Sequence, residues 1–420
     1  MVRTFTICYH YLLSLSTSMP LAINGSSPTC TDAWPTWPIW DEHERSGVLD
    51  VLESGRWWYG ERVKRFEHEY AAFQNAKFGV TVSSGTTALE TLLEAAGIGP
   101  GDEVIVPPYT FIATASAVLR VGAIPVFADI EPDTWSMDPE DVVRKITPRT
   151  KAIMPVHFGG RIVDMDRFLE IGRTHGVTIL EDACHSWGGK WRGKGTGALG
   201  RGGIFSFQVS KNIASAEGGI ILTDDEAFAD HCRSITNCGR TVGGAWYDHE
   251  NLGSNLRMTE FQAALLLGQL SRLEAHTLRR EENAAYLAER LSHIPGIGVT
   301  REDPRITRRA WHIFLLSIDA GSFGATRAQF MRALEAEGVP CSGGYARPAY
   351  KMGVFQNLKR MRANPDIALD YESVHCPNAE RACEETVWLS HTLLLAEHDS
   401  IGRIADAIEK IALHAAEIQA

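Results

Sequence analysis

The sequence predicts an α/β protein, with a mostly parallel sheet between helices in a large domain and a smaller C-terminal α+β domain. Short apolar runs alternate with helical patterns across residues 60–290, which is typical of such a sheet. After Ile294-Pro295-Gly296 the pattern changes to isolated strands and helices. The 420 residues also exceed the length of about 250 to 300 at which single cores stop growing.

Apolar periodicity predicts the elements of the large domain, residues 60–290. A helix is expected over 61–75, where Val63, Phe66, Tyr70 and Phe73 recur at helical spacing. Strands are expected over 78–82, 103–106, 124–129, 152–156, 177–180 and 203–208. Helices are expected after Ser84, over 113–121, from Asp138, from Met165 and over 258–280. Together these elements alternate as strand, helix and strand units require.

The remaining segments form the two ends of the chain. Residues 19–59 are expected to be an arm and a helix, because four prolines and three tryptophans lie between Pro20 and Trp40. The smaller domain, 291–420, is expected to contain a strand over 312–318 and helices over 326–337 and 401–418. We expect residues 1–18 to be a disordered or mis-started extension, because polar residues interrupt their apolar stretch and no small-residue cleavage site follows.

The composition argues against several classes of protein. A net charge of −11 without a stripe of Lys and Arg disfavours nucleic acid as a partner. No apolar run is long enough to cross a membrane. Eight scattered cysteines without a CxxC pair fit the reduced thiols of a cytoplasmic enzyme better than a disulfide framework or a metal site. Within the central motif, Cys184 is interpreted as a packing residue rather than a reactive thiol.

The residues that carry chemistry gather between Ile179 and Asp224. An apolar strand ends at Glu181 and Asp182, at the strand end where open α/β sheets bind ligands. A second apolar strand is followed by Lys211 in a tight turn before Glu217. A lone lysine is usually a solvated loop residue. An amine beside a buried carboxylate is nevertheless what pyridoxal phosphate needs, because the amine forms a Schiff base and the carboxylate keeps the pyridine nitrogen protonated.

A third segment completes this interpretation. The run Ser83 to Thr87 stands just before an Ala/Leu-rich helix, and the amides at a helix N-terminus bind anions such as the cofactor's phosphate. Three separate segments therefore fit one cofactor, and the sequence predicts an enzyme that uses pyridoxal 5'-phosphate.

Five motifs in this order resemble the DegT/DnrJ/EryC1/StrS family of sugar and cyclitol aminotransferases. They are SSGTTAL at 83–89, PPYTFIATASAV at 107–118, EDACHS at 181–186, FSFQVSKN with AEGG at 205–219, and GSNLRMTEFQAALLLGQL at 253–270. The resemblance covers roughly residues 40–415. It implies the type I fold of pyridoxal-phosphate-dependent transferases.

The resemblance also implies catalytic roles. Lys211 matches the Schiff-base lysine of S-x-x-x-S-K, counted from Ser206, and would also move a proton as general acid and base. Some related dehydratases carry histidine at this position, so the lysine favours amino transfer. Asp182 would pair with the pyridinium nitrogen, although a helix-capping aspartate is the alternative. His185 would face the ring near its phenolic oxygen, and its alternative is a purely structural histidine.

Further residues would hold the cofactor. By the resemblance, Phe111 would stack on the ring, with core packing as the alternative. Gly85, Thr86 and Ser206 would contact the phosphate. Asn255 would reach the phosphate from the neighbouring subunit, which implies a homodimer with shared active sites. One departure from the family stands after Lys211, where NIASAEGG replaces the more usual Thr-Gly before the glutamate and leaves the local turn open.

The function implied is transfer of an amino group from L-glutamate or L-glutamine to the keto group of a cyclitol or a keto-sugar, with ping-pong kinetics. The segment CPNAERACEETVWLSHTLLL, residues 376–395, favours the cyclitol (scyllo-inosose) branch. The alternatives are a nucleotide-sugar aminotransferase, a sugar dehydratase on the same scaffold, and a regulatory homologue that binds the cofactor without catalysis. Lys211 and Asp182 argue against the last. The sequence does not select the acceptor ketone or the donor.

Overall fold

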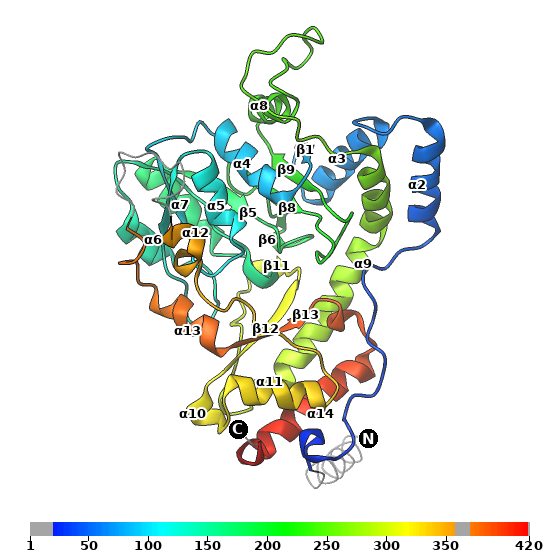
Figure 1. Ribbon diagram of the computed structural model, residues 1–420, viewed down its shortest axis with the longest axis vertical. Helices are drawn as coiled ribbons and strands as arrows, with labels where there is room; N and C mark the ends of the chain where they lie inside the picture. Colours follow the sequence, from blue (N-terminus) through cyan, green and yellow to red (C-terminus); the bar gives the residue numbers. More distant parts are fainter. Residues whose placement is uncertain (1–19, 358–369, 419–420) are drawn as a thin grey trace.

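The computed structural model describes residues 20–357 and 370–418, so the extension expected at residues 1–18 lies outside the described residues. A large α/β part stands above a smaller C-terminal part, and the long helix α9 (Glu260–Leu291) runs from one to the other (Figure 1). The predicted α/β class is confirmed. The boundary at residue 290 stays a prediction, because α9 passes through it without a break.

A seven-stranded sheet in the order β1-β9-β8-β5-β4-β2-β3 organises the large part. Its strands are β1 (Phe78–Val82), β2 (Glu103–Val106), β3 (Ile124–Phe127), β4 (Thr150–Ile153), β5 (Thr178–Asp182), β8 (Gly202–Ser206) and β9 (Gly219–Thr223). Strand β9 is antiparallel to both of its neighbours, and the other neighbouring pairs are parallel. The mostly parallel sheet predicted from the sequence is therefore present.

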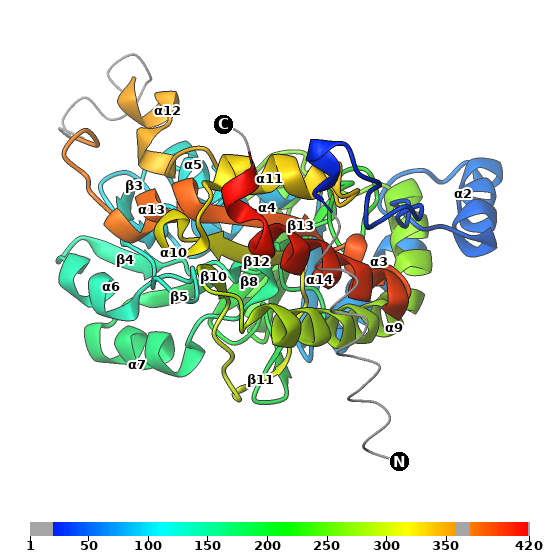
Figure 2. The ribbon, with the colours of Figure 1, turned by 90° about the horizontal axis from the view of Figure 1, so that it is seen from below.

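Helices cover both faces of this sheet. They are α3 (Glu61–Phe73), α4 (Gly85–Ala95), α5 (Ala113–Arg120), α6 (Pro139–Lys145), α7 (Met165–His175) and α8 (Glu226–Thr236). In β2, Val104 and Val106 belong to one buried cluster with residues of α4 and α5, whereas Ile105 belongs to another with residues of α6 and α7. This alternation follows from the two-residue period of a strand. Figure 2 shows α5 and α7 on opposite sides of the sheet.

The C-terminal part contains an antiparallel sheet in the order β10-β12-β13. Its strands are β10 (Ile297–Val299), β12 (Ile313–Ile318) and β13 (Thr386–Ser390), and its helices are α10 (Ala320–Phe323), α11 (Arg327–Ala336) and α14 (His398–Leu413). Helices α12 (Gly353–Gln356) and α13 (Pro377–Glu385) instead pack against the core of the large part. A third small sheet, β11-β6-β7, joins β11 (Ile306–Arg308) to β6 (Lys190–Trp191) and β7 (Lys194–Gly195).

The extent predicted for the long helix was wrong at its C-terminal end. Helix α9 continues past residue 280 to Leu291 because Ala284, Leu287 and Leu291 are buried in the core of the C-terminal part. At its start, the Thr259 hydroxyl accepts from the Gln262 backbone N–H, and the Gln262 side chain accepts from the Thr259 N–H. This capping box satisfies two amides that the first turn leaves unpaired.

The N-terminal arm runs along the C-terminal part toward helix α2 (Glu42–Ser54), which packs on α9 (Figure 1). The Trp34 indole donates to the carbonyl of Gly338 at 2.8 Å. The Trp37 indole donates to the carbonyl of Val209 at 2.8 Å, in the loop that carries Lys211. Within residues 20–357 and 370–418, no helix is both long and apolar enough to span a bilayer.

Candidate active site

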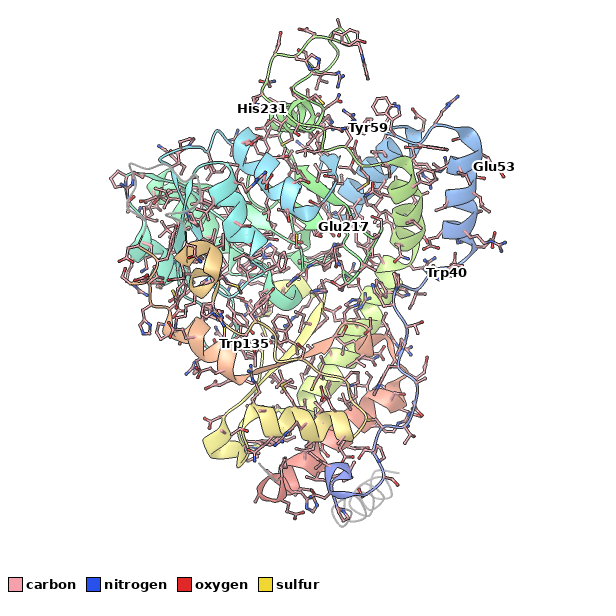
Figure 3. All side chains as sticks on the ribbon, in the orientation of Figure 1. Trp40, Glu53, Tyr59, Trp135, Glu217 and His231 are labelled. Atoms are coloured by element: carbon pink, nitrogen blue, oxygen red, sulfur yellow. The ribbon has the colours of Figure 1, made fainter. Side chains whose placement is uncertain are left out.

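A cavity of about 440 Å³ opens at the carboxyl ends of β5 and β8. It brings together seven of the residues predicted from the sequence: Gly85, Thr86, Phe111, Asp182, His185, Ser206 and Lys211. Glu217, which also lines the cavity, lies near the middle of the molecule in Figure 3. Four separate segments of the chain thus meet at the strand ends where open α/β sheets bind ligands.

One end of the cavity is the N-terminus of α4. The Ser84 hydroxyl accepts from the Thr87 N–H at 3.2 Å, and the Thr87 hydroxyl accepts from the Ser84 N–H at 3.1 Å. This cap leaves the Gly85 and Thr86 amides without a hydrogen-bond partner in the described part of the chain. Free amides at a helix N-terminus form an anion site.

Ser206 approaches this helix terminus closely. A Cβ on Gly85 would stand 2.6 Å from the Cβ of Ser206, so only glycine allows the two segments to lie so near each other. The serine hydroxyl therefore borders the same space as the free amides. Together these groups fit the phosphate of pyridoxal phosphate.

Asp182 is the last residue of β5 and is 4% exposed. Its carboxylate accepts the Thr114 hydroxyl at 2.8 Å and the Cys184 N–H at 3.2 Å. The helix-capping alternative is wrong, because no helix in residues 20–357 or 370–418 begins beside it. Two donors leave the carboxylate with capacity for a further one, such as a pyridinium N–H.

Lys211 lies in the loop of residues 207–218 between β8 and β9. Three backbone bonds close this loop: Phe207 N–H to the Gly218 carbonyl, Val209 N–H to the Ala216 carbonyl, and Ser215 N–H to the Phe207 carbonyl. Ala216 adopts a left-handed φ of 67°, so the turn left open by the sequence keeps a geometry that favours glycine.

The surroundings of the Lys211 amine favour its reactive form. Its Nζ stands 5.6 Å from the centre of the Trp187 ring, and it makes no hydrogen bond or ion pair with the residues that the structure describes. Burial lowers the pKa of Lys211, and the nearby Cys184 and Asp182 oppose that shift. A lowered pKa increases the neutral fraction of the amine, which is the nucleophilic form.

His185 is a buried neutral imidazole at the cavity wall. The Gly159 N–H donates to its Nδ1 at 3.2 Å, so the ring hydrogen belongs on Nε2. Burial and the charge of Lys211 lower its pKa well below the usual value. The side chain is therefore available as a hydrogen-bond donor rather than as a cation.

Phe111 lines the cavity with 56% of its surface exposed. The core-packing alternative is therefore wrong. A half-exposed ring at the wall of the cavity is available to stack on a planar ligand.

One residue of the site was not predicted from the sequence, and one predicted residue lies outside the cavity. Thr114 was not singled out, although a hydroxyl in the first turn of a helix that faces a strand end is a usable signal. Asn255 is exposed and does not line the cavity of its own chain. Its neighbour Leu256 accepts the Ser83 N–H at 2.7 Å.

Cys184 lines the cavity beside these residues. Burial, followed by the charge of Asp182, raises the pKa of its thiol well above the usual value. A thiol with a raised pKa is a poor nucleophile, which agrees with the packing interpretation.

The fold and this cavity together define a pyridoxal-phosphate-dependent aminotransferase. The model of the DegT/DnrJ/EryC1/StrS aminotransferase family matches residues 38–409, and the chain belongs to this family. The resemblance seen in the sequence motifs is confirmed over nearly the whole chain.

Individual relatives agree with this assignment. The chain is 37% identical to 3-amino-5-hydroxybenzoate synthase of Amycolatopsis mediterranei, over 90% of this chain and 98% of the relative. It is 36% identical to L-glutamine:scyllo-inosose aminotransferase of Streptomyces griseus, over 93% and 97%. The crystal structure of 3-amino-5-hydroxybenzoic acid synthase superposes with a TM-score of 0.83 at 35% identity, covering 92% of this chain and all of that one.

Proposed function

We propose that this enzyme transfers an amino group from L-glutamine or L-glutamate to the keto group of a cyclitol such as a scyllo-inosose. The observation that carries the proposal is the cavity in which the Lys211 amine, the Asp182 carboxylate and the free amides of α4 meet. The likeness to L-glutamine:scyllo-inosose aminotransferase of Streptomyces griseus supports glutamine as the donor and a cyclitol as the acceptor.

Bound pyridoxal phosphate supplies an electron sink that stabilises negative charge on the carbon carrying the amino group. The protein's own residues do the rest. Lys211 would hold the cofactor through its amine, and its free amine would carry a proton to and from the substrate carbon. Because burial lowers the pKa of Lys211, a larger fraction of its amine is neutral and able to accept this proton.

The Asp182 carboxylate would control the protonation of the cofactor's ring nitrogen, and Thr114 and Cys184 hold this carboxylate. The Thr114 hydroxyl and the Cys184 N–H donate to the carboxylate and fix its orientation. An ionised Asp182 would keep the pyridine nitrogen protonated. The neutral His185, with its hydrogen on Nε2, would donate to an oxygen on the ring, and Phe111 would cover a face of the ring.

The phosphate would sit on the Gly85 and Thr86 amides and the Ser206 hydroxyl. These groups provide two backbone donors at the positive end of an eleven-residue helix and one side-chain donor. They would anchor the cofactor by its phosphate, independently of its attachment to Lys211.

Our proposal includes a homodimer that completes each site. Residues 238–253 project beyond α8 (Figure 1) and carry exposed apolar side chains, with Tyr247 at 84% and Leu252 at 96% exposure. Large exposed apolar groups are typical of interaction surfaces. Asn255 stands at the base of this projection, where it would reach the phosphate of a second copy.

The donor and acceptor are tested by isotope transfer. Purified protein loaded with pyridoxal phosphate is incubated with glutamine labelled on its α-nitrogen and with a panel of keto-cyclitols and keto-sugars. We expect the label in an aminocyclitol. Label in a nucleotide-sugar product, or a product that loses oxygen without gaining nitrogen, would replace this proposal with one of its enzymatic alternatives.

Mixing two inactive variants tests the shared site. Lys211→Ala and Asn255→Ala are each expected to be inactive, and a mixed dimer contains one site with an intact lysine and an intact partner asparagine. Mixing should therefore restore activity. No recovery from subunits that do exchange would show that Asn255 does not serve a second copy.

We also place the enzyme in the cytoplasm. The cysteines in residues 20–357 and 370–418 are free thiols, which suits a reducing compartment. Fusing residues 1–40 to a reporter that works only after export tests this assignment, because efficient export would contradict it.

A further inference from the structure

Two buried histidines outside the cavity hold the residues on either side of Lys211. His391, which follows β13, faces the carbonyl of Ser210, with its Nε2 3.0 Å from that oxygen. His312, which precedes β12, faces the side chain of Asn212, with its Nδ1 2.8 Å from Oδ1. Both histidines belong to the C-terminal part, about 100 residues or more along the chain from the loop.

The hydrogen-bond partners determine which nitrogen of each ring carries the hydrogen. The Asn212 amide donates to the Ala310 carbonyl at 2.9 Å, so its Oδ1 must accept and His312 must donate from Nδ1. The Ser210 carbonyl can only accept, so His391 donates from Nε2. Its Nδ1 then accepts from Arg280 at 3.1 Å.

The rings of His391 and His312 continue a row that ends at His185 in the cavity wall. His312 lies 4.3 Å from the ring of His185 and 5.4 Å from the ring of His391, centre to centre. Burial lowers the pKa of both His312 and His391 well below the usual value. The row therefore acts through hydrogen bonds and packing rather than through charge.

A further contact from a distant segment adds to the backbone bonds that close this loop. The Trp37 indole of the arm donates to the Val209 carbonyl, so contacts from distant segments reach Val209, Ser210 and Asn212, on both sides of Lys211. The Lys211 side chain between them remains unpaired among the described residues. Fixing the residues around a side chain while leaving its amine free is what preorganisation of a reacting group requires.

We propose that His312 and His391 are positioning residues that aim the Lys211 amine at the cofactor. This inference rests on the proposed role of Lys211 and adds that the C-terminal part sets the lysine's position. Neither histidine lines the cavity, so both act through the loop.

The first experiment removes the donors. His312→Leu and His391→Leu are prepared as full-length protein, with Phe314→Leu as the control, since Phe314 is a buried residue of β12 in the core of the C-terminal part. We expect kcat to fall on the order of 10- to 100-fold in the histidine variants, the effect of a small misplacement of a reacting group. The acceptor KM should stay unchanged. The control should keep its kcat.

A second measurement does not depend on turnover. Pyridoxal phosphate is added to each variant, and borohydride followed by peptide mapping measures how fast the cofactor becomes fixed to Lys211. The rate should fall in the histidine variants by about the same factor as kcat and stay at the wild-type value in Phe314→Leu.

If the leucine variants do not fold, asparagine and glutamine substitutions at positions 312 and 391 test the proposal instead. An asparagine amide can replace the Nδ1 donor and a glutamine amide the Nε2 donor. At position 312 we expect Asn to retain more activity than Gln, and at position 391 we expect Gln to retain more than Asn. The opposite order, or equal activities, would overturn the proposal.

The outcomes separate this inference from the proposed function. If borohydride leaves Lys211 of the wild-type protein unlabelled, the proposed function fails. If the wild-type lysine is labelled and the folded leucine variants match it in labelling rate and in kcat, only the positioning role fails.

Discussion

The two faces of β5 at its carboxyl end each bury one carboxylate, and the two carboxylates differ in how many hydrogen-bond donors surround them. Glu181 and Asp182 are neighbours and therefore point to opposite sides of the strand. Glu181 accepts backbone N–H groups from Gly197, Leu199 and Gly200 and lies 3.0 Å from His157 Nε2. Asp182 has two donors, from Thr114 and Cys184, and faces the cavity.

A structural acid and a functional one differ here in the acceptor capacity that the protein leaves free. Glu181 has no exposed surface and its acceptor sites are filled by the protein, so it holds the 197–200 turn against the strand. Asp182 keeps acceptor capacity for a ligand. Burial alone does not distinguish them, whereas the number of satisfied acceptor sites does.

The largest effect is expected for Asp182→Asn. This variant removes the charge that would hold the cofactor nitrogen protonated, and activity should fall on the order of 10²- to 10³-fold. The free energy of unfolding should change by less than about 1 kcal/mol. Steady-state rates and denaturant unfolding measure the two quantities. Full activity in this variant would remove Asp182 from the proposed chemistry.

Glu181→Gln should have the reverse effect, a loss of stability without a loss of activity in the folded protein. A glutamine side chain accepts only at its carbonyl oxygen, so its NH2 group would face donors such as the Gly197 N–H and leave them unpaired, at a cost of about 1 to 3 kcal/mol each. We expect the free energy of unfolding to fall by about 3 kcal/mol, while the folded fraction keeps activity. A loss of activity larger than the loss of folded protein would contradict the structural role.

Gly85→Ala tests the crowding on the cavity face. The new Cβ would stand 2.6 Å from the Cβ of Ser206, and such overpacking costs about 1 to 3 kcal/mol. We expect a lower unfolding temperature and weaker binding of pyridoxal phosphate. Gly99→Ala is the matched control, because its nearest contact, the Val121 carbonyl oxygen, is 4.0 Å away. Equal behaviour of both variants would exclude a special role for Gly85.

The smallest effect is expected for Ala216→Gly, across the loop from Lys211. The left-handed φ of 67° at Ala216 costs an alanine about 1 kcal/mol or more. Glycine should therefore stabilise the protein by about 0.5 kcal/mol after its own entropic cost. Ala285→Gly, on the exposed side of α9, should instead lose about 1 kcal/mol. Thermal unfolding of both variants checks the signs.

Local patterns determined much of this protein. The apolar run before Asp182, the turn at Lys211 and the serine-capped helix at Gly85 each lie within a few residues, so periodicity and capping chemistry revealed them. The chemistry of an amine, a buried carboxylate and an anion-binding helix end then indicated one common cofactor, pyridoxal phosphate. The strands β1 and β2 were predicted to the residue for the same reason.

Only the tertiary structure decided which side chains meet across long sequence separations. Thr114 reaches Asp182 from α5, and His312, His391 and Trp37 reach the Lys211 loop from segments at both ends of the chain. The end of α9 likewise depends on the core of the C-terminal part. These contacts leave no periodic trace in the sequence, because a hydrogen bond between distant segments requires only that the folded backbone bring two groups within reach.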